Sequence, residues 1–71
     1  MTEYRSYDEL EPMSVNELGI LALGSQEVMN KWLNEPVFSL EGQRPIAVLL
    51  QHNGVERVRG VLIGIISGFC A

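Results

Sequence analysis

The first apolar positions that recur at helical spacing lie between residues 15 and 23. A capping box precedes them. In Ser-Val-Asn-Glu (residues 14–17) the serine hydroxyl can accept from the glutamate amide, and the glutamate carboxylate can reach back to the serine amide. Gly24 follows the last apolar residue and suits the left-handed conformation that closes a helix. We therefore predict a first helix over Val15–Leu23. Its inner face consists of Leu18, Leu21 and Ala22.

A second helix is expected directly afterwards. Ser25 can cap its start, Glu27 places a negative charge in its first turn, and Pro36 ends it. Four apolar residues form one face of this helix: Val28, Met29, Trp32 and Leu33. The two helices make an αα-hairpin, and we interpret Trp32 as an anchor of the core rather than a platform for a ligand.

Residues 36–43 show no helical period and contain the turn formers Ser39 and Gly42. We predict a loop here that turns Phe38 and Leu40 toward the core. Pro45 then suits the first position of a third, short helix. We expect that helix to carry four apolar residues and to stop near residues 53–54. These residues are Ile46, Val48, Leu49 and Leu50.

The last quarter of the chain combines a helical stripe with strand-forming residues. Asn53 and Glu56 repeat the capping-box spacing, and apolar residues follow at three- and four-residue steps. Several residues of the segment are β-branched, and each glycine weakens a helix by about 1 kcal/mol, which favours a strand. We predict a helix because the stripe is continuous through Val55, Val58, Leu62, Ile65 or Ile66, and Phe69. The fold class is therefore all-α, a small bundle of about four short helices.

Glycines in this last segment recur every four residues, at Gly60, Gly64 and Gly68. This spacing allows helix backbones to approach closely. The uncharged stretch that contains them has only twelve residues, well short of the roughly 20 that a membrane-spanning helix needs. We therefore expect no membrane span and interpret the segment as a soluble helix that packs tightly against a neighbour.

Charge separates an N-terminal arm from a helical domain. The net charge of the chain is −4, and residues 1–17 carry all of it. We interpret residues 1–12 as a flexible acidic arm and residues 13–71 as one helical domain. Four scattered cations in the rest of the chain do not make the positive face that nucleic-acid binding requires, so no direct binding to nucleic acid is expected. The chain lacks a basic, apolar start, which predicts a cytoplasmic protein without a secretory signal.

The sequence offers little for catalysis or metal binding. One histidine (His52), one cysteine (Cys70) and one aspartate (Asp8) cannot make a disulfide or a four-ligand zinc site, and their positions suggest no catalytic triad. We expect no enzyme activity, no metal and no cofactor. Because domains below about 70–80 residues gain little stability from a single core, we also expect a homodimer.

Three motifs occur in order along the chain: Trp-Leu-Asn-Glu-Pro (32–36), Leu-Glu-Gly-Gln-Arg-Pro (40–45) and, after Gly54, a closing stretch over 62–68. Together they resemble the toxin-binding domain of the Xre/MbcA/ParS-type antitoxins over roughly residues 18–71. The family positions in this chain are Trp32, Pro36, Gly42, Pro45, Gly54 and Gly68. The resemblance implies an all-helical, dimeric domain that docks on a protein toxin. In the family the toxin is typically of the NAD-consuming or ADP-ribosylating RES kind, and C-terminal elements block its cleft.

Some positions depart from the family pattern. The family usually has Thr or Ser before the second proline and Asp two residues after it, a capping pair, whereas this chain has Arg44 and Ala47. The family's usual cation two residues before that proline is Gln43 here, so a cation survives only one place later, at Arg44. A helix-turn-helix domain usually precedes the toxin-binding domain in the family. We expect none here, and therefore no autorepression through DNA binding.

Several residues are candidates for contacts with a partner. Arg57 and Arg59 lie about 200° apart on the predicted helix and cannot act as one clamp. Either arginine could contact a toxin, or both could be solvated and balance Glu56. The C-terminal tail could pack on a dimer mate or enter a partner's cleft, and both uses stay open. The candidate partner-binding residues are Arg44, Arg57, Arg59, Phe69, Cys70 and Ala71.

Two functions of different kinds follow. The leading hypothesis is an antitoxin that binds a cognate toxin and covers its active cleft without catalysis. The alternative is a stand-alone dimerisation or adaptor module, or a phage-borne counter-defence inhibitor that engages a different host complex.

Overall fold

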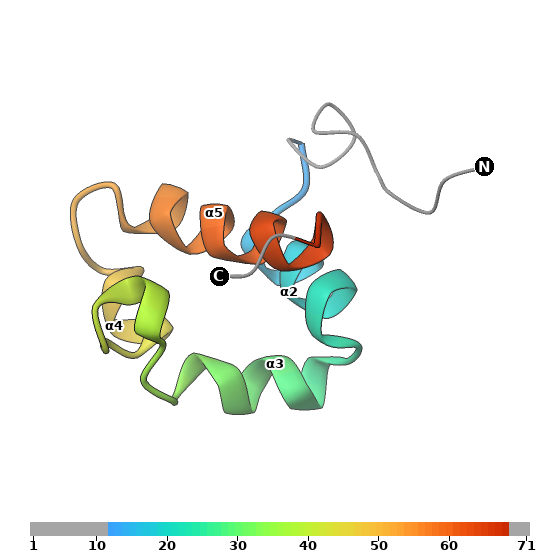
Figure 1. The fold of residues 1–71 in the computed structure, drawn as a ribbon, viewed down its shortest axis with the longest axis horizontal. Helices are drawn as coiled ribbons and strands as arrows, with labels where there is room; N and C mark the ends of the chain where they lie inside the picture. The colour runs from blue at the N-terminus through green and yellow to red at the C-terminus, as the bar shows by residue number, and fades with distance from the viewer. Residues whose placement is uncertain (1–11, 69–71) are drawn as a thin grey trace.

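The computed structural model describes residues 12–68. These residues form, in order, α2 (Val15–Leu23), α3 (Gln26–Leu33), a single 3-10 turn η1 (Phe38–Leu40), α4 (Pro45–Val48) and α5 (Gly54–Ile66). The part of the chain described contains no strand, only an isolated bridge between Val37 and Gln43. Helix α5 packs on α2, with α3 and α4 below it in the view of Figure 1. The predicted all-α class with four short helices is confirmed.

Local capping determines where the first two helices begin and end. The Ser14 hydroxyl accepts from the Glu17 amide at 3.1 Å, and the Ser14 amide donates to the Glu17 carboxylate at 2.9 Å. Gly24 closes α2 in the left-handed conformation with φ 106°. The Ser25 hydroxyl accepts from the Val28 amide at 3.2 Å and starts α3. The predicted bounds of the first helix and both serine caps are therefore confirmed.

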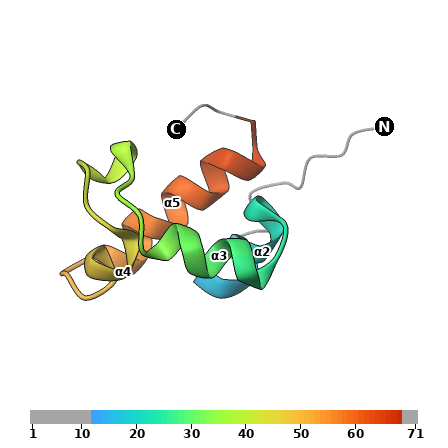
Figure 2. The same cartoon turned by 90° about the horizontal axis from the view of Figure 1, so that it is seen from below.

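Six buried apolar side chains make the core, and every element contributes at least one of them. They are Leu18, Met29, Leu40, Val48, Val58 and Leu62. Trp32 is half-buried and packs against this cluster, as expected of a core anchor. Figure 2 shows the helices gathered around this centre, with η1 and α4 at one end and the turn between α2 and α3 at the other.

Three apolar residues that the sequence assigned to inner faces are exposed: Leu21, Val28 and Val55. At 100° per residue, Leu21 lies about 100° round α2 from Ala22, which packs on the core, and Val28 lies about 100° from the buried Met29. Val55 lies on the stripe of Val58 and Leu62, but the stripe extends one turn beyond the buried core. The buried faces of α2 and α3 are therefore narrower than predicted, and the buried face of α5 is one turn shorter than predicted.

The loop before α4 turns only one of its two large apolar residues inward. Leu40 is buried, whereas Phe38 is 92% exposed, so the expected burial of Phe38 is wrong. The reason is the 3-10 turn η1, which has three residues per turn and points side chains two positions apart about 120° away from each other. A pair that would share a face of a strand is separated by this turn.

The region between α4 and α5 also differs from expectation. Helix α4 ends at Val48, and Leu50 lies in the following turn with 89% of its surface exposed. Asn53 takes the left-handed conformation with φ 59°, and its side chain makes no capping hydrogen bond to α5. The predicted capping box of Asn53 and Glu56 is therefore wrong. A capping side chain reaches the helix from an extended backbone, which the tight turn into α5 does not provide.

Two close approaches between helices occur at glycines outside the four-residue spacing. A Cβ added to Gly54 would overlap the carbonyl of Val48 in α4, and one added to Gly19 would overlap the end of Met29 in α3. Gly60 is exposed and has open space beside it, and Gly68 follows the end of α5 with φ 85°. The four-residue glycine spacing therefore does not mark a tight helix contact at Gly60.

Candidate functional site

The elements at the end of the molecule that holds η1 and α4 carry four exposed large apolar side chains. Phe38 and Leu50 are almost completely exposed, and Ile46 and Val55 are about half exposed. They come from η1, the turn after α4, α4 itself and the first turn of α5, which lie at one end in Figures 1 and 2. We call these four residues the Phe38 end. Large apolar side chains this exposed are typical of binding surfaces when they occur together.

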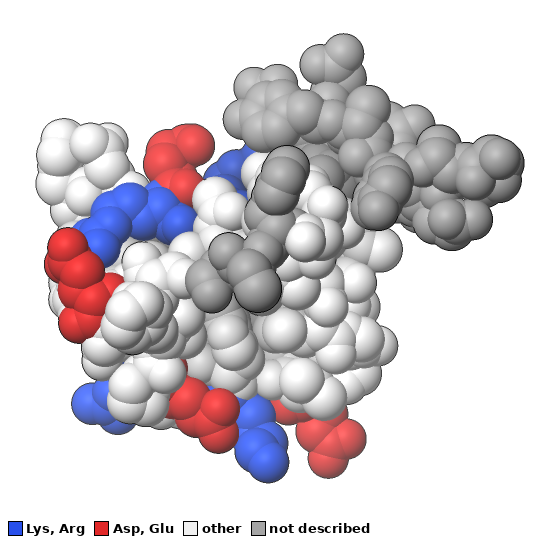
Figure 3. Space-filling model, in the orientation of Figure 1, with Lys and Arg blue, Asp and Glu red and all other residues white. Residues whose placement is uncertain are grey.

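On the face shown in Figure 3, most of the visible charged side chains lie toward the edge, and the part of the surface not covered by grey atoms is largely uncharged nearer the middle. Residues 12–68 contain five glutamates and four basic residues, so this part of the chain is close to neutral.

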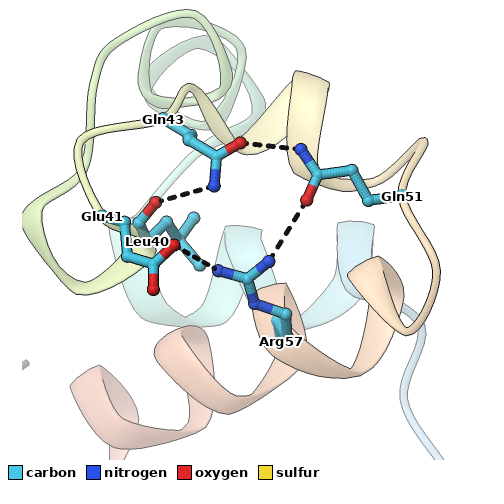
Figure 4. Close-up of polar contacts among 5 residues, drawn as sticks. All are labelled: Leu40, Glu41, Gln43, Gln51 and Arg57. Atoms are coloured by element: carbon cyan, nitrogen blue, oxygen red, sulfur yellow. Dashed lines mark hydrogen bonds and ion pairs between the residues drawn. The ribbon is translucent and has the colours of Figure 1, made fainter.

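A chain of polar contacts joins the loop that carries Phe38 to α5 (Figure 4). Arg57 Nη1 donates to Gln51 Oε1 at 3.2 Å, and Arg57 Nη2 lies 3.7 Å from Glu41 Oε1. Gln51 Nε2 donates to Gln43 Oε1 at 2.7 Å, and Gln43 Nε2 donates to the Leu40 carbonyl oxygen at 3.3 Å. The Arg57 side chain of α5 is thus connected directly to Glu41 and, through Gln51, to Gln43.

The two arginines of α5 contact different parts of the molecule, as their angular separation predicts. Arg59 Nη1 donates to the backbone carbonyl oxygen of Met13, just before α2. Arg57 pairs with Glu41 rather than balancing Glu56. Arg44 is exposed at the N-cap of α4, and its side chain makes no capping hydrogen bond. Of the three candidate arginines, Arg44 is therefore the one most available to a partner.

The candidate residues Phe69, Cys70 and Ala71, and residues 1–11 of the acidic arm, lie outside the described residues. Over 12–68, no three side chains of His, Cys, Asp or Glu are grouped so that they could hold a metal ion. No helix in this range has the length and hydropathy needed to cross a membrane.

Comparison with known families gives one match. Residues 18–68 match the sequence model of the antitoxin Xre/MbcA/ParS C-terminal toxin-binding domain. The chain belongs to this family. No curated protein and no solved structure matches it. The matched stretch contains α3, η1, α4, α5 and most of α2, so it includes the whole Phe38 end of this toxin-binding domain.

The structure gives physical reasons for most of the residues that the resemblance predicts as family positions. Pro45 is buried at the first position of α4, and Gly42 has φ 79°, a conformation that favours glycine. Gly54 allows the close approach to Val48, and Trp32 packs on the core. Pro36 is exposed after α3. These residues therefore shape the domain and are not themselves gathered at one surface.

Two features of the site were missed by sequence reasoning. The exposure of Phe38 and Leu50 depends on where η1 and α4 turn, and both residues were assigned to helix or loop interiors. The contacts of Glu41, Gln43 and Gln51 join residues six to sixteen positions apart, for which no short-range pattern exists. The only signal was the two-residue spacing of Phe38 and Leu40, which would have predicted orientations about 120° apart if the 3-10 turn had been expected.

Proposed function

We propose that this protein is an antitoxin that binds a cognate protein toxin through its Phe38 end and covers the toxin's active cleft, without catalysing a reaction itself. The observation that carries the proposal is the coincidence of two facts. The toxin-binding family covers residues 18–68, and within them the most exposed large apolar side chain is Phe38.

The chemistry of the Phe38 end suits a protein partner. Burying a fully exposed phenylalanine contributes about 1.5–3 kcal/mol, and aromatic and arginine side chains are enriched among the residues that dominate binding energy. Arg44 is the N-cap residue of α4 and follows Gln43, whose backbone pairs with that of Val37, the residue before Phe38. An exposed arginine and an exposed phenylalanine that flank the same backbone bridge fit a partner surface that presents a carboxylate together with apolar groups.

The family resemblance directs the search for the toxin toward NAD-consuming or ADP-ribosylating proteins of RES type. The tagged protein would be recovered from its native lysate, and the co-purifying protein would be tested for NAD consumption before and after release. We expect one stoichiometric partner that is inactive in the complex and active alone. Recovery of a multisubunit host complex instead would contradict the proposal and support a counter-defence or adaptor role.

Substitution of Phe38 tests the proposed contact surface. Because Phe38 is 92% exposed, Phe38→Ser should leave the free energy of unfolding within about 0.5 kcal/mol of wild type but weaken toxin binding by about tenfold or more. Val28→Ser is a matched control, since Val28 is an exposed apolar residue in the first turn of α3 and does not belong to the Phe38 end. Titration calorimetry with the recovered toxin gives the dissociation constants. Equal weakening by both variants would show that Phe38 has no special role.

The tail of residues 69–71 is a separate part of the proposal, in which Phe69, Cys70 and Ala71 enter the toxin's cleft. A chain truncated after Gly68 should still bind the toxin through the Phe38 end but should inhibit NAD consumption less. Full inhibition by the truncated chain would assign occlusion to the described domain alone.

The expected homodimer and cytoplasmic location belong to the same proposal. A core of only six buried residues within 12–68 is small, which supports the expectation that a second copy adds stability. Size-exclusion chromatography with light scattering distinguishes the dimer from a monomer of 7.9 kDa.

A further inference from the structure

The segment from Val37 to Gln43 closes on itself and forms what we call the Phe38 loop. The Val37 amide donates to the Gln43 carbonyl oxygen at 3.1 Å, and the Gly42 amide donates back to the Val37 carbonyl oxygen at 3.0 Å. Within the loop, the Leu40 amide donates to Val37 at 2.9 Å, and the Leu40 side chain is buried in the core. The backbone is therefore well connected, although its most prominent side chain, Phe38, points into solvent.

The polar side chains that tie this loop to the rest of the domain lead to one residue, Arg57. Glu41 contacts Arg57 directly, and Gln43 reaches it through Gln51. Glu41 has a positive φ of 61°, so the backbone holds this carboxylate at the point where the chain reverses after η1. In Figure 4, Leu40 and Glu41 lie at the left, Gln43 at the top, Gln51 at the right and Arg57 of α5 below, so that the contacts run around a ring.

Arg57 determines the direction of each side-chain hydrogen bond in the series that runs from Arg57 through Gln51 and Gln43 to Leu40. A guanidinium donates and cannot accept, so Gln51 must turn its oxygen toward Arg57 and its nitrogen toward Gln43. Gln43 then presents its oxygen to Gln51 and its nitrogen to the Leu40 carbonyl oxygen. The planar fork also reaches Gln51 and Glu41 with different nitrogens, which a lysine ammonium on its flexible stem does less well.

The side chain of Arg57 is less exposed to solvent than that of Glu41, with which it pairs. The side chain of Arg57 is 36% exposed, whereas that of Glu41 is 81% exposed. Two of the guanidinium nitrogens are already engaged within the domain. Arg57 is thus better placed to support the Phe38 loop than to contact a toxin itself.

We propose that Arg57 is a positioning residue: it holds the Phe38 loop in one conformation, so that Phe38 meets the toxin without a further cost of ordering. Preordering of a binding loop strengthens association because the bound conformation is already populated. This inference rests on the proposed function, in which the Phe38 end contacts the toxin. It assigns Arg57 an indirect role and leaves direct contact to Phe38.

Hydrogen exchange on the free protein tests the first half of the inference. In Arg57→Met, the amides of the Phe38 loop should exchange about fivefold faster, the factor expected for the net loss of one hydrogen bond, while those of α2 and α3 keep their rates. Arg57→Lys should restore only part of the protection. Lys31→Met is the control, because it removes a cation from the exposed surface of α3, and it should leave the loop unchanged. Unchanged exchange in Arg57→Met would overturn the inference.

A double-mutant cycle with Phe38→Ser tests the second half, with the recovered NAD-consuming toxin as the probe. Arg57→Met should weaken binding about fivefold when Phe38 is present and have almost no effect when Phe38 is serine. Additive effects would mean that Arg57 contacts the toxin directly and would overturn the positioning role. If wild-type protein binds no such toxin, the proposed function and the role of Arg57 in binding both fail. Unchanged loop exchange with intact toxin binding would refute the positioning role alone.

Discussion

Replacement of Gly54 by alanine is expected to destabilise the domain, although alanine is the better helix former. Gly54 is the first residue of α5 and is buried against the end of α4. An added Cβ would overlap the Val48 carbonyl oxygen and lie 2.7 Å from the Val48 carbonyl carbon and 3.2 Å from the Leu49 Cα. All three atoms belong to the backbone, so no side-chain rotation can relieve the overlap. The methyl group fits only if α4 and α5 move apart.

The magnitude follows from two opposing effects. Replacing glycine by alanine within a helix normally stabilises by about 0.5–1 kcal/mol. Inserting a methyl group into a closely packed site costs about 1–3 kcal/mol. The net result for Gly54→Ala is a loss of about 1–2 kcal/mol, because the gain is small at the first helical position. Val48 is a core residue, so the displacement would also disturb the packing around it.

Gly60→Ala in the same helix is the matched control. Gly60 is exposed in the middle of α5, and a Cβ there would meet nothing within 4 Å. This substitution should stabilise by about 0.5–1 kcal/mol. Thermal unfolding followed by circular dichroism should then separate the two variants by on the order of 10 °C in Tm, since 1 kcal/mol shifts Tm by about 4–8 °C in a domain of this size.

Two outcomes would refute the reasoning. If Gly54→Ala raises Tm as Gly60→Ala does, α4 and α5 do not approach each other as closely as the structure shows. If Gly60→Ala lowers Tm, Gly60 packs against something beyond the described residues, and the four-residue glycine spacing would then point to a contact between copies.

Two further substitutions test the capping and the core. Ser14→Ala removes the hydroxyl that accepts from the Glu17 amide and should lower the free energy of unfolding, measured in urea, by about 1 kcal/mol. The control is Ser39→Ala at an exposed position of η1, which should change this free energy by less than about 0.5 kcal/mol. An equal loss in both variants would contradict the capping role of Ser14. Leu62→Ala leaves a cavity at a fully buried site and should lower the free energy of unfolding by about 2–5 kcal/mol. Leu50→Ala shortens an exposed side chain and should leave that free energy nearly unchanged. Similar urea midpoints for these two variants would show that the core is misassigned.

Features that depend on neighbours along the chain could be predicted from the sequence. The bounds of α2, the capping box at Ser14, the cap at Ser25 and the left-handed Gly24 all follow from groups within four residues of one another. Such contacts form wherever the segment lies in the fold. The ordered motifs likewise identified the toxin-binding family, because spacing along the chain is itself a property of the sequence.

The candidate site was predicted less well, because exposure depends on what else covers a residue. Sequence reasoning found Arg44 and Arg57 as residues of interest but gave no account of the contacts that Arg57 makes. Phe38 and Leu50 have the composition of core residues, and nothing near them in the sequence shows that η1 and α4 leave them uncovered.

The amino-acid sequence by itself therefore determined the helical class, the capped helices and the family, since these depend on short-range hydrogen bonding, periodicity and motif order. Only the tertiary structure decided which apolar residues are buried, that Gly54 rather than Gly60 marks a close helix approach, and that Arg57 contacts the loop carrying Phe38. Each of these depends on distances between elements that are separated along the chain, and local chemistry does not set those distances.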